Sequence, residues 1–502
     1  MMDEVYERGY HDPPEKFVCD RHVRDDYLED EIRRYADSAQ CDYCDRTGEE
    51  AFAIPISMIV EEIAWVIHAY WDDAGNFVPW SGRDGGWQWS VEDIRDVLDD
   101  EFSWSFEDNQ ELRDDLFDRF LGREIAKVSI LSPTTEEQLR WGWGLFSEVV
   151  KARNRYLFQT PRDEDPRASE SGEIHPWEML DRLGEVVRKC ELIRDVPSGS
   201  HWYRARPHEP GAKHTTGKAL GTVPAEYAVY SNRMSAAGIP MFYGSKDEAT
   251  AVLEVFQPGD DVTAGRFVAL RSLKVLDLAN LPKTPSIFDL PRRELLEMLV
   301  FLQHFVRDLS EPVAKDGHEH IDYVPTQIVT EYFRHVFGPD RLDGLLYPSS
   351  KNPGAIACVL FFDNDACGDL REERGAPPGT VLALDRRSVK THTGPPDPIP
   401  LQEVPTTISS IECRSIPARM SRRCGSIQGS VLGPPSRVRY AASCTLDLRS
   451  DFLLSHVPNL LCVIVPRHRL KLVDSRRPST CPPHRSPRGR PRAGGGREAV
   501  LP

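Results

Sequence analysis

Residues 201–256, HWYRARPHEPGAKHTTGKALGTVPAEYAVYSNRMSAAGIPMFYGSKDEATAVLEVF, decide the fold of this chain and carry most of its chemistry. Arg204 and Arg206 stand two residues apart on an alternation of apolar and polar residues, which is typical of a β-strand. Arg233 precedes a turn of small residues, and Tyr243 lies in the short strand-like run that follows. The stretch therefore predicts two strands that carry arginine and tyrosine side chains toward one site.

The same stretch ends in a predicted helix, 247–256, that places Glu254 among Ala, Val and Leu. An acid on the apolar side of a short helix is costly unless a site needs it. Arginines upstream and a carboxylate downstream suit an anionic substrate whose reacting centre becomes positive. We therefore expect Glu254 to be functional; the alternative is an ordinary salt-bridged helix acid.

Four blocks of the chain, taken in order, resemble the RES domain family, which is named for its Arg, Glu and Ser. They are WYRAR at 202–206, the span from Arg233 through Tyr243 to Glu254, DYVPTQIVTEY at 322–332 and GLLYPS at 344–349. The front of the chain resembles the N-terminal domain that is often joined to RES domains. Together the two resemblances reach about residue 370.

The resemblance implies an α+β fold. A helical N-terminal domain with a zinc knuckle would precede an ADP-ribosyltransferase-like split antiparallel β-core with surrounding helices. It also implies an NAD+-consuming enzyme, with NAD+ as substrate, phosphate or water as acceptor, and an antitoxin or regulatory protein as partner. The alternatives are a protein ADP-ribosyltransferase on the same cleft and a catalytically silent interaction module whose working part is the zinc-bearing domain.

The resemblance assigns four catalytic residues, and their chemistry fits cleavage of the nicotinamide–ribose bond, which makes an oxocarbenium-like centre. Glu254 would hold the ribose hydroxyls and stabilise the positive charge. Arg204 would grip the pyrophosphate with its planar donors. Tyr243 would stack on the nicotinamide, and Ser349 would hydrogen-bond the nicotinamide end.

Two further arginines are assigned to substrate binding. Arg233 would help to hold the pyrophosphate, and Arg206 is the alternative to Arg204 as the functional arginine. Ser350 stands beside Ser349, so either hydroxyl could fill that role.

Near the N-terminus, Cys19-x2-His22 and Cys41-x2-Cys44 form two chelating pairs. Two-residue spacing lets both side chains of a pair reach one ion, and two pairs fill a tetrahedral zinc site. A closed set of four ligands leaves no open position, so this predicts a structural zinc. The alternative is three reduced surface thiols and an unrelated histidine.

Charge is distributed unevenly along the 502 residues, whose net charge is −17. Residues 381–502 hold 20 Lys and Arg against 8 Asp and Glu, a net charge of +12, so the first 380 residues carry −29. An acidic body is a poor binder of nucleic acid, which leaves only weak binding through the basic tail. We find no secretory signal and no membrane helix, and we expect a soluble, cytoplasmic protein without disulfides.

Composition and patterning predict four parts. Residues 1–165 form the zinc-knuckle and helical N-terminal domain, and residues 166–194 a linker and helix. The RES catalytic domain spans 195–375. From 376 to 502, Pro, Ser and Arg increase and hydrophobic periodicity fades, which predicts a disordered, low-complexity basic tail.

Overall fold

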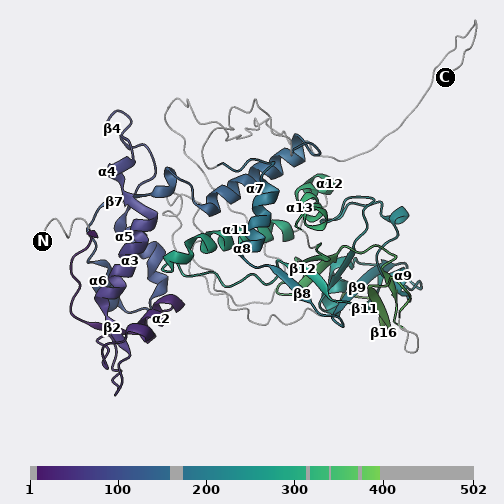
Figure 1. Cartoon of the computed structure of the whole chain (residues 1–502), viewed down its shortest axis with the longest axis horizontal. Helices are drawn as coiled ribbons and strands as arrows, with labels where there is room; N and C mark the ends of the chain where they lie inside the picture. The colour runs from purple at the N-terminus through teal and green to yellow at the C-terminus, as the bar shows by residue number, and fades with distance from the viewer. Residues whose placement is uncertain (1–7, 159–172, 312–316, 339–340, 371–375, 396–502) are drawn as a thin grey trace, which may run out of the picture. The chain divides into compact units, whose positions relative to one another are not determined.

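The structure, a computed structural model, describes residues 8–158, 173–311, 317–338, 341–370 and 376–395. The predicted tail lies outside these residues from 396 onward, and so does the start of the predicted linker, 166–172. The described elements are helices and one large mixed sheet (Figure 1). The predicted α+β class, with a helical N-terminal region, is therefore confirmed.

Helix α3 (Ile56–Tyr70) is the centre of the N-terminal region. Its apolar residues recur at helical spacing, and Ile59, Val60 and Ile63 are buried in one core with residues of the surrounding elements. Those elements are β1 (Phe17–Cys19), α2 (Asp26–Tyr35), β2 (Ala53–Pro55), β3 (Trp71–Asp73), α5 (Ile94–Val97), η2 (Leu98–Phe102), α6 (Gln110–Phe117) and β7 (Glu124–Lys127). Three short elements of the same region add no residue to this core: η1 (Asp20–His22), α4 (Ala74–Phe77) and β6 (Glu92–Asp93). Strand β1 pairs with β2, and β7 pairs with both β3 and β6, all antiparallel.

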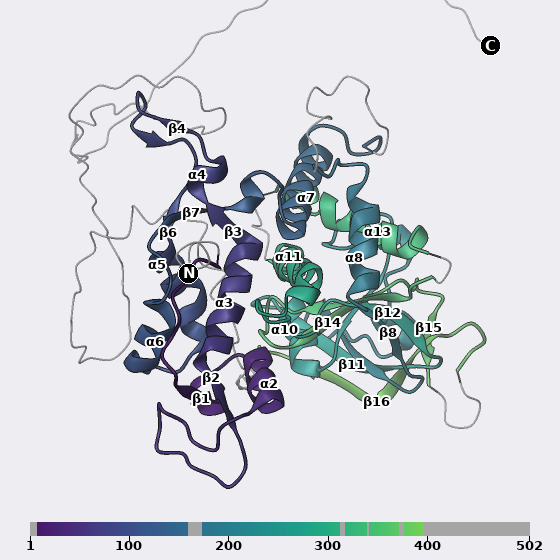
Figure 2. The same ribbon diagram turned by 60° about the vertical axis from the view of Figure 1, so that its left-hand side comes forward.

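A layer of four helices packs against the large sheet: α7 (Thr135–Ala152), α8 (Met179–Lys189), α11 (Arg293–Ser310) and α13 (Val324–His335). Figures 1 and 2 show α7, α8 and α11 beside one another. Trp143 and Phe146 of α7 share a core with Leu345 and Val359 of the sheet. Helix α7 begins with a complete capping box between Thr134 and Glu137. By packing, α7 therefore joins the core of the sheet, although we had assigned it to the N-terminal domain.

The sheet has nine strands in the order β15-β16-β11-β9-β10-β14-β13-β12-β8. They are β8 (Ile193–Val196), β9 (His201–His208), β10 (Phe242–Ser245), β11 (Asp261–Ala269), β12 (Leu273–Asp277), β13 (Gly344–Pro348), β14 (Ile356–Leu360), β15 (Cys367–Asp369) and β16 (Leu382–His392). Strands β9 and β10 pair at a single position, Ser245 opposite Tyr203. The sheet is thus split into two halves at this point. Six of its eight strand pairs are antiparallel, whereas β12–β13 and β15–β16 are parallel.

Strand β16 lies beyond residue 375, where we expected the RES domain to end and the tail to begin. It pairs with β11 along most of that strand, with a register shift between Ala264 and Arg266. Leu382, Ala383 and Leu384 at its start are fully buried. The predicted boundary is therefore too early, because the sheet continues to His392.

The segment between β12 and α11 connects the two regions. Ile287 and Phe288 are buried in the core of the N-terminal region, where Phe288 packs against Phe102. Lys283 forms an ion pair with Asp26 of α2. The burial of Ile287 and Phe288 is expected to stabilise this connection more than the exposed ion pair does, because removing apolar surface from water is the larger contribution. A short segment of the sheet-bearing region is thus an integral part of the N-terminal core.

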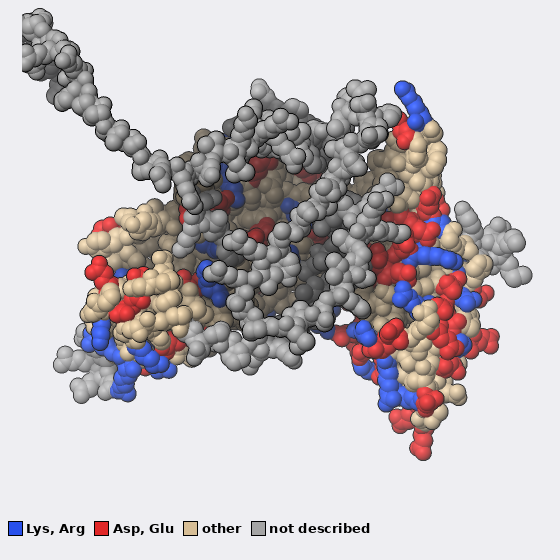
Figure 3. Space-filling model, turned by 180° about the vertical axis from the view of Figure 1, so that it is seen from behind, with Lys and Arg blue, Asp and Glu red and all other residues tan. Residues whose placement is uncertain are grey.

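The described surface carries many charged side chains, some of them in exposed ion pairs such as Arg24–Glu107 and Arg33–Glu29. Acidic side chains cover much of the N-terminal region on the face seen in Figure 3, at the right. A membrane span would need a long apolar helix, and the described part of the chain contains none.

Candidate active site and metal centre

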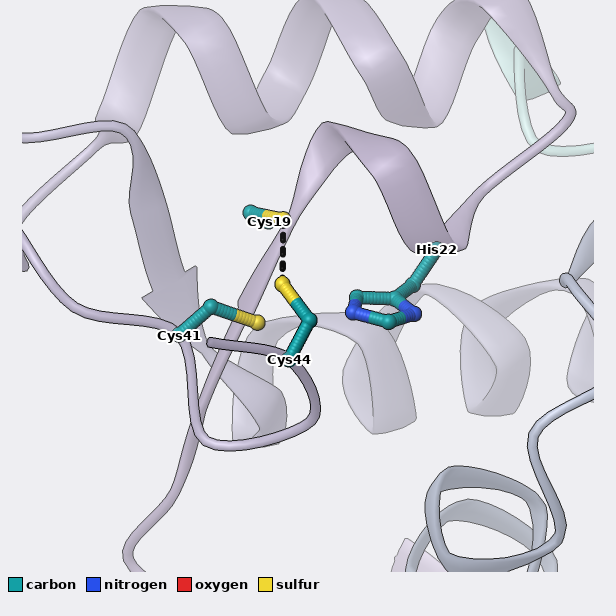
Figure 4. A group of neighbouring side chains, drawn as sticks. All are labelled: Cys19, His22, Cys41 and Cys44. Atoms are coloured by element: carbon teal, nitrogen blue, oxygen red, sulfur yellow. Dashed lines mark hydrogen bonds between the residues drawn. The ribbon is translucent and has the colours of Figure 1, made fainter. Parts of the chain in front are cut away.

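The four predicted metal ligands come from two segments that meet beside the β1–β2 pair. Cys19 ends β1 and His22 ends η1, whereas Cys41 and Cys44 lie between α2 and β2. Their ligand atoms all lie within 4.8 Å of one another, and Figure 4 shows the three sulfur atoms and the imidazole gathered around one centre. The predicted grouping of these side chains is confirmed.

The geometry of this cluster fits a tetrahedral zinc ion. The sulfur atoms of Cys19 and Cys44 are 3.9 Å apart, and two thiolates at the usual Zn–S distance are separated by roughly 3.8 Å. Nε2 of His22 is buried and has no hydrogen-bond partner in the described part of the chain. A buried nitrogen without a partner is costly, and a bound ion would satisfy it. The four side chains can therefore hold zinc and leave no open position for catalysis.

Arg204 projects from β9 into a buried site. Its side chain is only 8% exposed, and burial lowers its pKa to about 10, so it stays charged at neutral pH. Nε donates to the carbonyl of Leu220 at 3.0 Å, and Nη1 donates to the carbonyl of Tyr243 at 2.6 Å. Within the described ranges it has no carboxylate partner. A buried cation held by two carbonyls and the ring of Phe242, without a carboxylate, is a candidate anion-binding group.

Arg206 lies on the same face of β9 as Arg204, because side chains two residues apart on a strand point the same way. Its Nη2 donates to the carbonyl of Gly221 at 2.9 Å, and burial lowers its pKa as well. Both arginines thus hold the Leu220–Gly221 turn. Arg206 is therefore still an alternative to Arg204 as the arginine that binds the substrate.

Tyr243, on β10, links this group to Arg233. Its hydroxyl is 2.9 Å from Oγ of Ser235, and burial raises its pKa to about 12, so the phenol remains neutral. Nη1 of Arg233 donates to the carbonyl of Leu309, in the last turn of α11, at 3.0 Å. Thr326 donates to the carbonyl of Arg233 at 2.5 Å. Helices α11 and α13 therefore position the loop that precedes Tyr243.

Glu254 lies in the last turn of α10 (Glu248–Val255), which Asp247 caps. It is exposed, so our expectation of an acid on the apolar side of this helix is wrong. The apolar face is formed instead by Ala251 and Val252, which pack against Ala205 of β9. Glu254 therefore faces outward, where a substrate can reach its carboxylate.

Ser349 contacts Glu254 directly. Its hydroxyl donates to Oε1 of Glu254 at 2.6 Å, and its Oγ accepts the backbone N–H groups of Lys351 and Asn352, each at 3.2 Å. Only 4% of Ser349 is exposed. These contacts point to a positioning role for Ser349, because its hydroxyl already holds the carboxylate.

The comparisons with known proteins agree with this architecture. Residues 201–381 match the model of the RES domain, and residues 35–164 match that of the HEPN/RES N-terminal domain 1. The chain contains a RES domain. No curated protein and no solved structure matches the chain. The RES match implies, in general terms, an NAD+-related function of the toxin or effector type.

The two matched ranges leave informative residues outside. The RES match ends at residue 381, just before β16, although β16 belongs to the same sheet and pairs with β11 and β15. The match to the N-terminal domain begins at residue 35, so it includes Cys41 and Cys44 but not Cys19 or His22. Half of the metal cluster thus comes from sequence in front of the matched domain.

Tyr347 of the RES domain is a residue to which our sequence analysis gave no role. Burial raises its pKa well above its usual range, and the negative charge of Glu254 raises it further, whereas the positive charge of Arg233 lowers it. Tyr347 therefore lies electrostatically between the Glu254–Ser349 pair and the Tyr243–Arg233 group. Its position two residues before Ser349, on the same face of the chain, is the signal that could have identified it.

Proposed function

We propose that this chain is an NAD+-consuming enzyme that cleaves the nicotinamide–ribose bond by phosphorolysis or hydrolysis, and that it acts as a toxin or defence effector. The observation that carries the proposal is the contact between Ser349 and the exposed carboxylate of Glu254 inside a matched RES domain. An antitoxin or other regulatory protein would hold such an activity in check. The fold alone does not determine the reaction, whereas the chemistry of these side chains restricts it.

Glu254 would act on the ribose. When the C1′–N bond breaks, the electron pair leaves with the nicotinamide nitrogen, which becomes neutral, and positive charge develops at C1′. A carboxylate held beside that carbon stabilises the charge and can hold the ribose hydroxyls. Water or a phosphate oxygen then forms the new bond to C1′, and an attacking water releases a proton. The exposed position of Glu254 is consistent with this role.

Arg204 would bind the pyrophosphate. Two of its donor groups are occupied by the carbonyls of Leu220 and Tyr243, which fix the plane of the guanidinium. Its other N–H groups remain to form charge-assisted hydrogen bonds to phosphate oxygens. Arg206 and Arg233 would add positive charge nearby, and the neutral phenol of Tyr243 would orient the nicotinamide.

We expect Ser349→Ala to lower kcat for NAD+ cleavage roughly 10- to 100-fold with little change in KM, because the carboxylate loses the donor that orients it. The two backbone N–H groups that Ser349 accepts would also lose a partner, at about 1–2 kcal/mol of stability. Steady-state kinetics at a temperature where both proteins are folded measures the effect. Ser350→Ala is the matched control and should leave kcat unchanged; equal losses in the two variants would contradict the assignment.

The acceptor is tested by incubating the full chain with NAD+ and following the products by chromatography, with and without inorganic phosphate. Loss that requires phosphate and yields ADP-ribose 1″-phosphate identifies a phosphorylase, and loss without phosphate that yields free ADP-ribose identifies a hydrolase. ADP-ribose attached to protein would instead identify a protein ADP-ribosyltransferase. Intact NAD+ under every condition would contradict the proposal.

A further inference from the structure

The turn between β13 and β14, residues 349–355, is attached to helix α10 at two points. The first is the hydrogen bond from Ser349 to Glu254 described above. The second lies about one helical turn earlier, where Nδ2 of Asn352 donates to Oγ1 of Thr250 at 2.6 Å. Residues four apart on a helix lie on the same face, so one face of α10 makes both contacts. Our sequence analysis gave no role to Asn352 or Thr250.

Both members of the second contact are buried. Asn352 is only 6% exposed, and Thr250 is fully buried. A buried amide is costly without a hydrogen-bond partner, and a buried polar contact that is satisfied makes its surroundings rigid. Thr250 is itself fixed, because its backbone N–H donates to Oδ1 of Asp247, the N-cap of α10, at 2.7 Å. The Asn352–Thr250 pair therefore sets the position of the 349–355 turn relative to the helix.

The backbone of Asn352 also determines where the proton of Ser349 points. The N–H groups of Lys351 and Asn352 both donate to Oγ of Ser349, each at 3.2 Å. A serine hydroxyl has two lone pairs and one proton, so these contacts leave the proton for Oε1 of Glu254. The carbonyl of Asn352 accepts the N–H of Ala355 at 3.1 Å, which closes the turn. A displacement of Asn352 would therefore move the donor that orients the carboxylate.

We propose that Asn352 is a positioning residue for the cleavage of NAD+, and that it acts through Ser349 by means of its contact with Thr250. This inference rests on the proposed function, because it takes Glu254 as the group that stabilises charge on the ribose. It adds the origin of the geometry of that carboxylate, a buried amide–hydroxyl pair behind Ser349. Misorientation of a reacting group slows the chemical step more than it weakens binding of the substrate.

Steady-state kinetics of the full chain, at a temperature where every variant is folded, tests the role in cleavage. Asn352→Ala should lower kcat about tenfold and leave KM within about twofold. Thr250→Val keeps the size of the side chain but removes its hydroxyl, so it should give the same pattern. Thr250→Ser keeps the hydroxyl and should retain the original kcat.

Asn109→Ala is the matched control for loss of stability alone. Oδ1 of Asn109 accepts the N–H of Leu112 at 3.1 Å and so caps helix α6 in the N-terminal region. The variant should lower the Tm by a few degrees and leave kcat unchanged. A kcat of Asn352→Ala equal to that of the original protein, or a loss of kcat in Asn109→Ala as large as in Asn352→Ala, would overturn the proposal.

The double variant Asn352→Ala/Ser349→Ala distinguishes positioning from a general structural effect. Because Asn352 acts through Ser349, its removal should change kcat by less than about twofold once residue 349 is alanine. Two independent structural losses would multiply instead. A kcat of the double variant equal to the product of the two separate losses would contradict the proposal.

Hydrogen–deuterium exchange of the same proteins is a readout that needs no activity. Peptides covering 349–355 should exchange at least about tenfold faster in Asn352→Ala and Thr250→Val, whereas those of α13 should not change. Unchanged exchange of 349–355 overturns the proposal. An original protein that leaves NAD+ intact overturns the proposed function, and with it the role in cleavage, but does not alter the exchange result. The two failures are therefore distinguishable.

Discussion

Replacing Glu254 with glutamine is expected to lower the rate of NAD+ loss by about 10²–10³-fold. The substitution keeps the size and the hydrogen-bonding capacity of the side chain but removes the charge that would stabilise the oxocarbenium-like centre. Glu254 is exposed and its direct contact is the hydroxyl of Ser349 at 2.6 Å, so the variant should fold normally. Initial rates of NAD+ loss, measured at matched protein concentration, give the ratio.

Glu248→Gln is the matched control for this experiment, because Glu248 lies in the first turn of the same helix, α10. Its carboxylate pairs with Lys390 and His392, each at 2.9 Å. Loss of such partly exposed pairs costs at most about 1 kcal/mol, and the rate should stay within about twofold of the original. A Glu254→Gln protein that retains full activity would remove Glu254 from the mechanism.

Removal of metal from the Cys19, His22, Cys41 and Cys44 cluster is expected to have the largest effect on stability. The ion would join two separate segments, one carrying Cys19 and His22 and the other Cys41 and Cys44, in the core of the N-terminal region, where Cys19 and Cys41 are buried. Losing it would take several kcal/mol from folding and lower the Tm by about 10 °C or more. Mass spectrometry under non-denaturing conditions should find one zinc per chain, and Cys41→Ser should abolish it.

Cys190→Ser provides the matched control, since Cys190 is a buried thiol far in sequence from the cluster. It should keep its zinc and lose only the stability expected for a buried hydroxyl, about 1–3 kcal/mol. A metal-free protein with the Tm of the untreated sample would show that the cluster is simply a group of reduced thiols.

The sequence predicted the parts of the fold that local patterns determine. The alternation at Arg204 and Arg206 predicted β9, and the spacing of the cysteine pairs predicted a cluster that the structure contains. The sequence could not reveal that Arg204 donates a hydrogen bond to the backbone carbonyl of Tyr243. A contact of this kind between two strands depends on their register and not on the identity of the side chains. Ser349 and Glu254 were both assigned to the substrate site, but the hydrogen bond between them was not predicted, because it joins residues 95 positions apart in the sequence.

Three predictions about the fold were wrong: the end of the RES domain, the burial of Glu254 and the domain to which α7 belongs. The charged sequence LALDRRSVKTH begins with three buried residues, yet its position in a stretch rich in Pro, Ser and Arg led us to place β16 in the tail. Glu254 follows apolar neighbours in sequence, but the helix turns it away from them. Helix α7 was placed in the N-terminal domain, 1–165, but its Trp143 and Phe146 pack into the core of the sheet, because an apolar stripe on a helix does not specify its partner.

The most direct test of the account is the release of nicotinamide from NAD+ by the purified, zinc-loaded full chain, followed by proton NMR in the presence of inorganic phosphate. We predict one nicotinamide for each NAD+ consumed, at a rate that Glu254→Gln abolishes and Glu248→Gln preserves. An unchanged NAD+ spectrum with folded protein, or equal nicotinamide release by the Glu254→Gln variant, would contradict the claim that this RES domain cleaves NAD+ at Glu254.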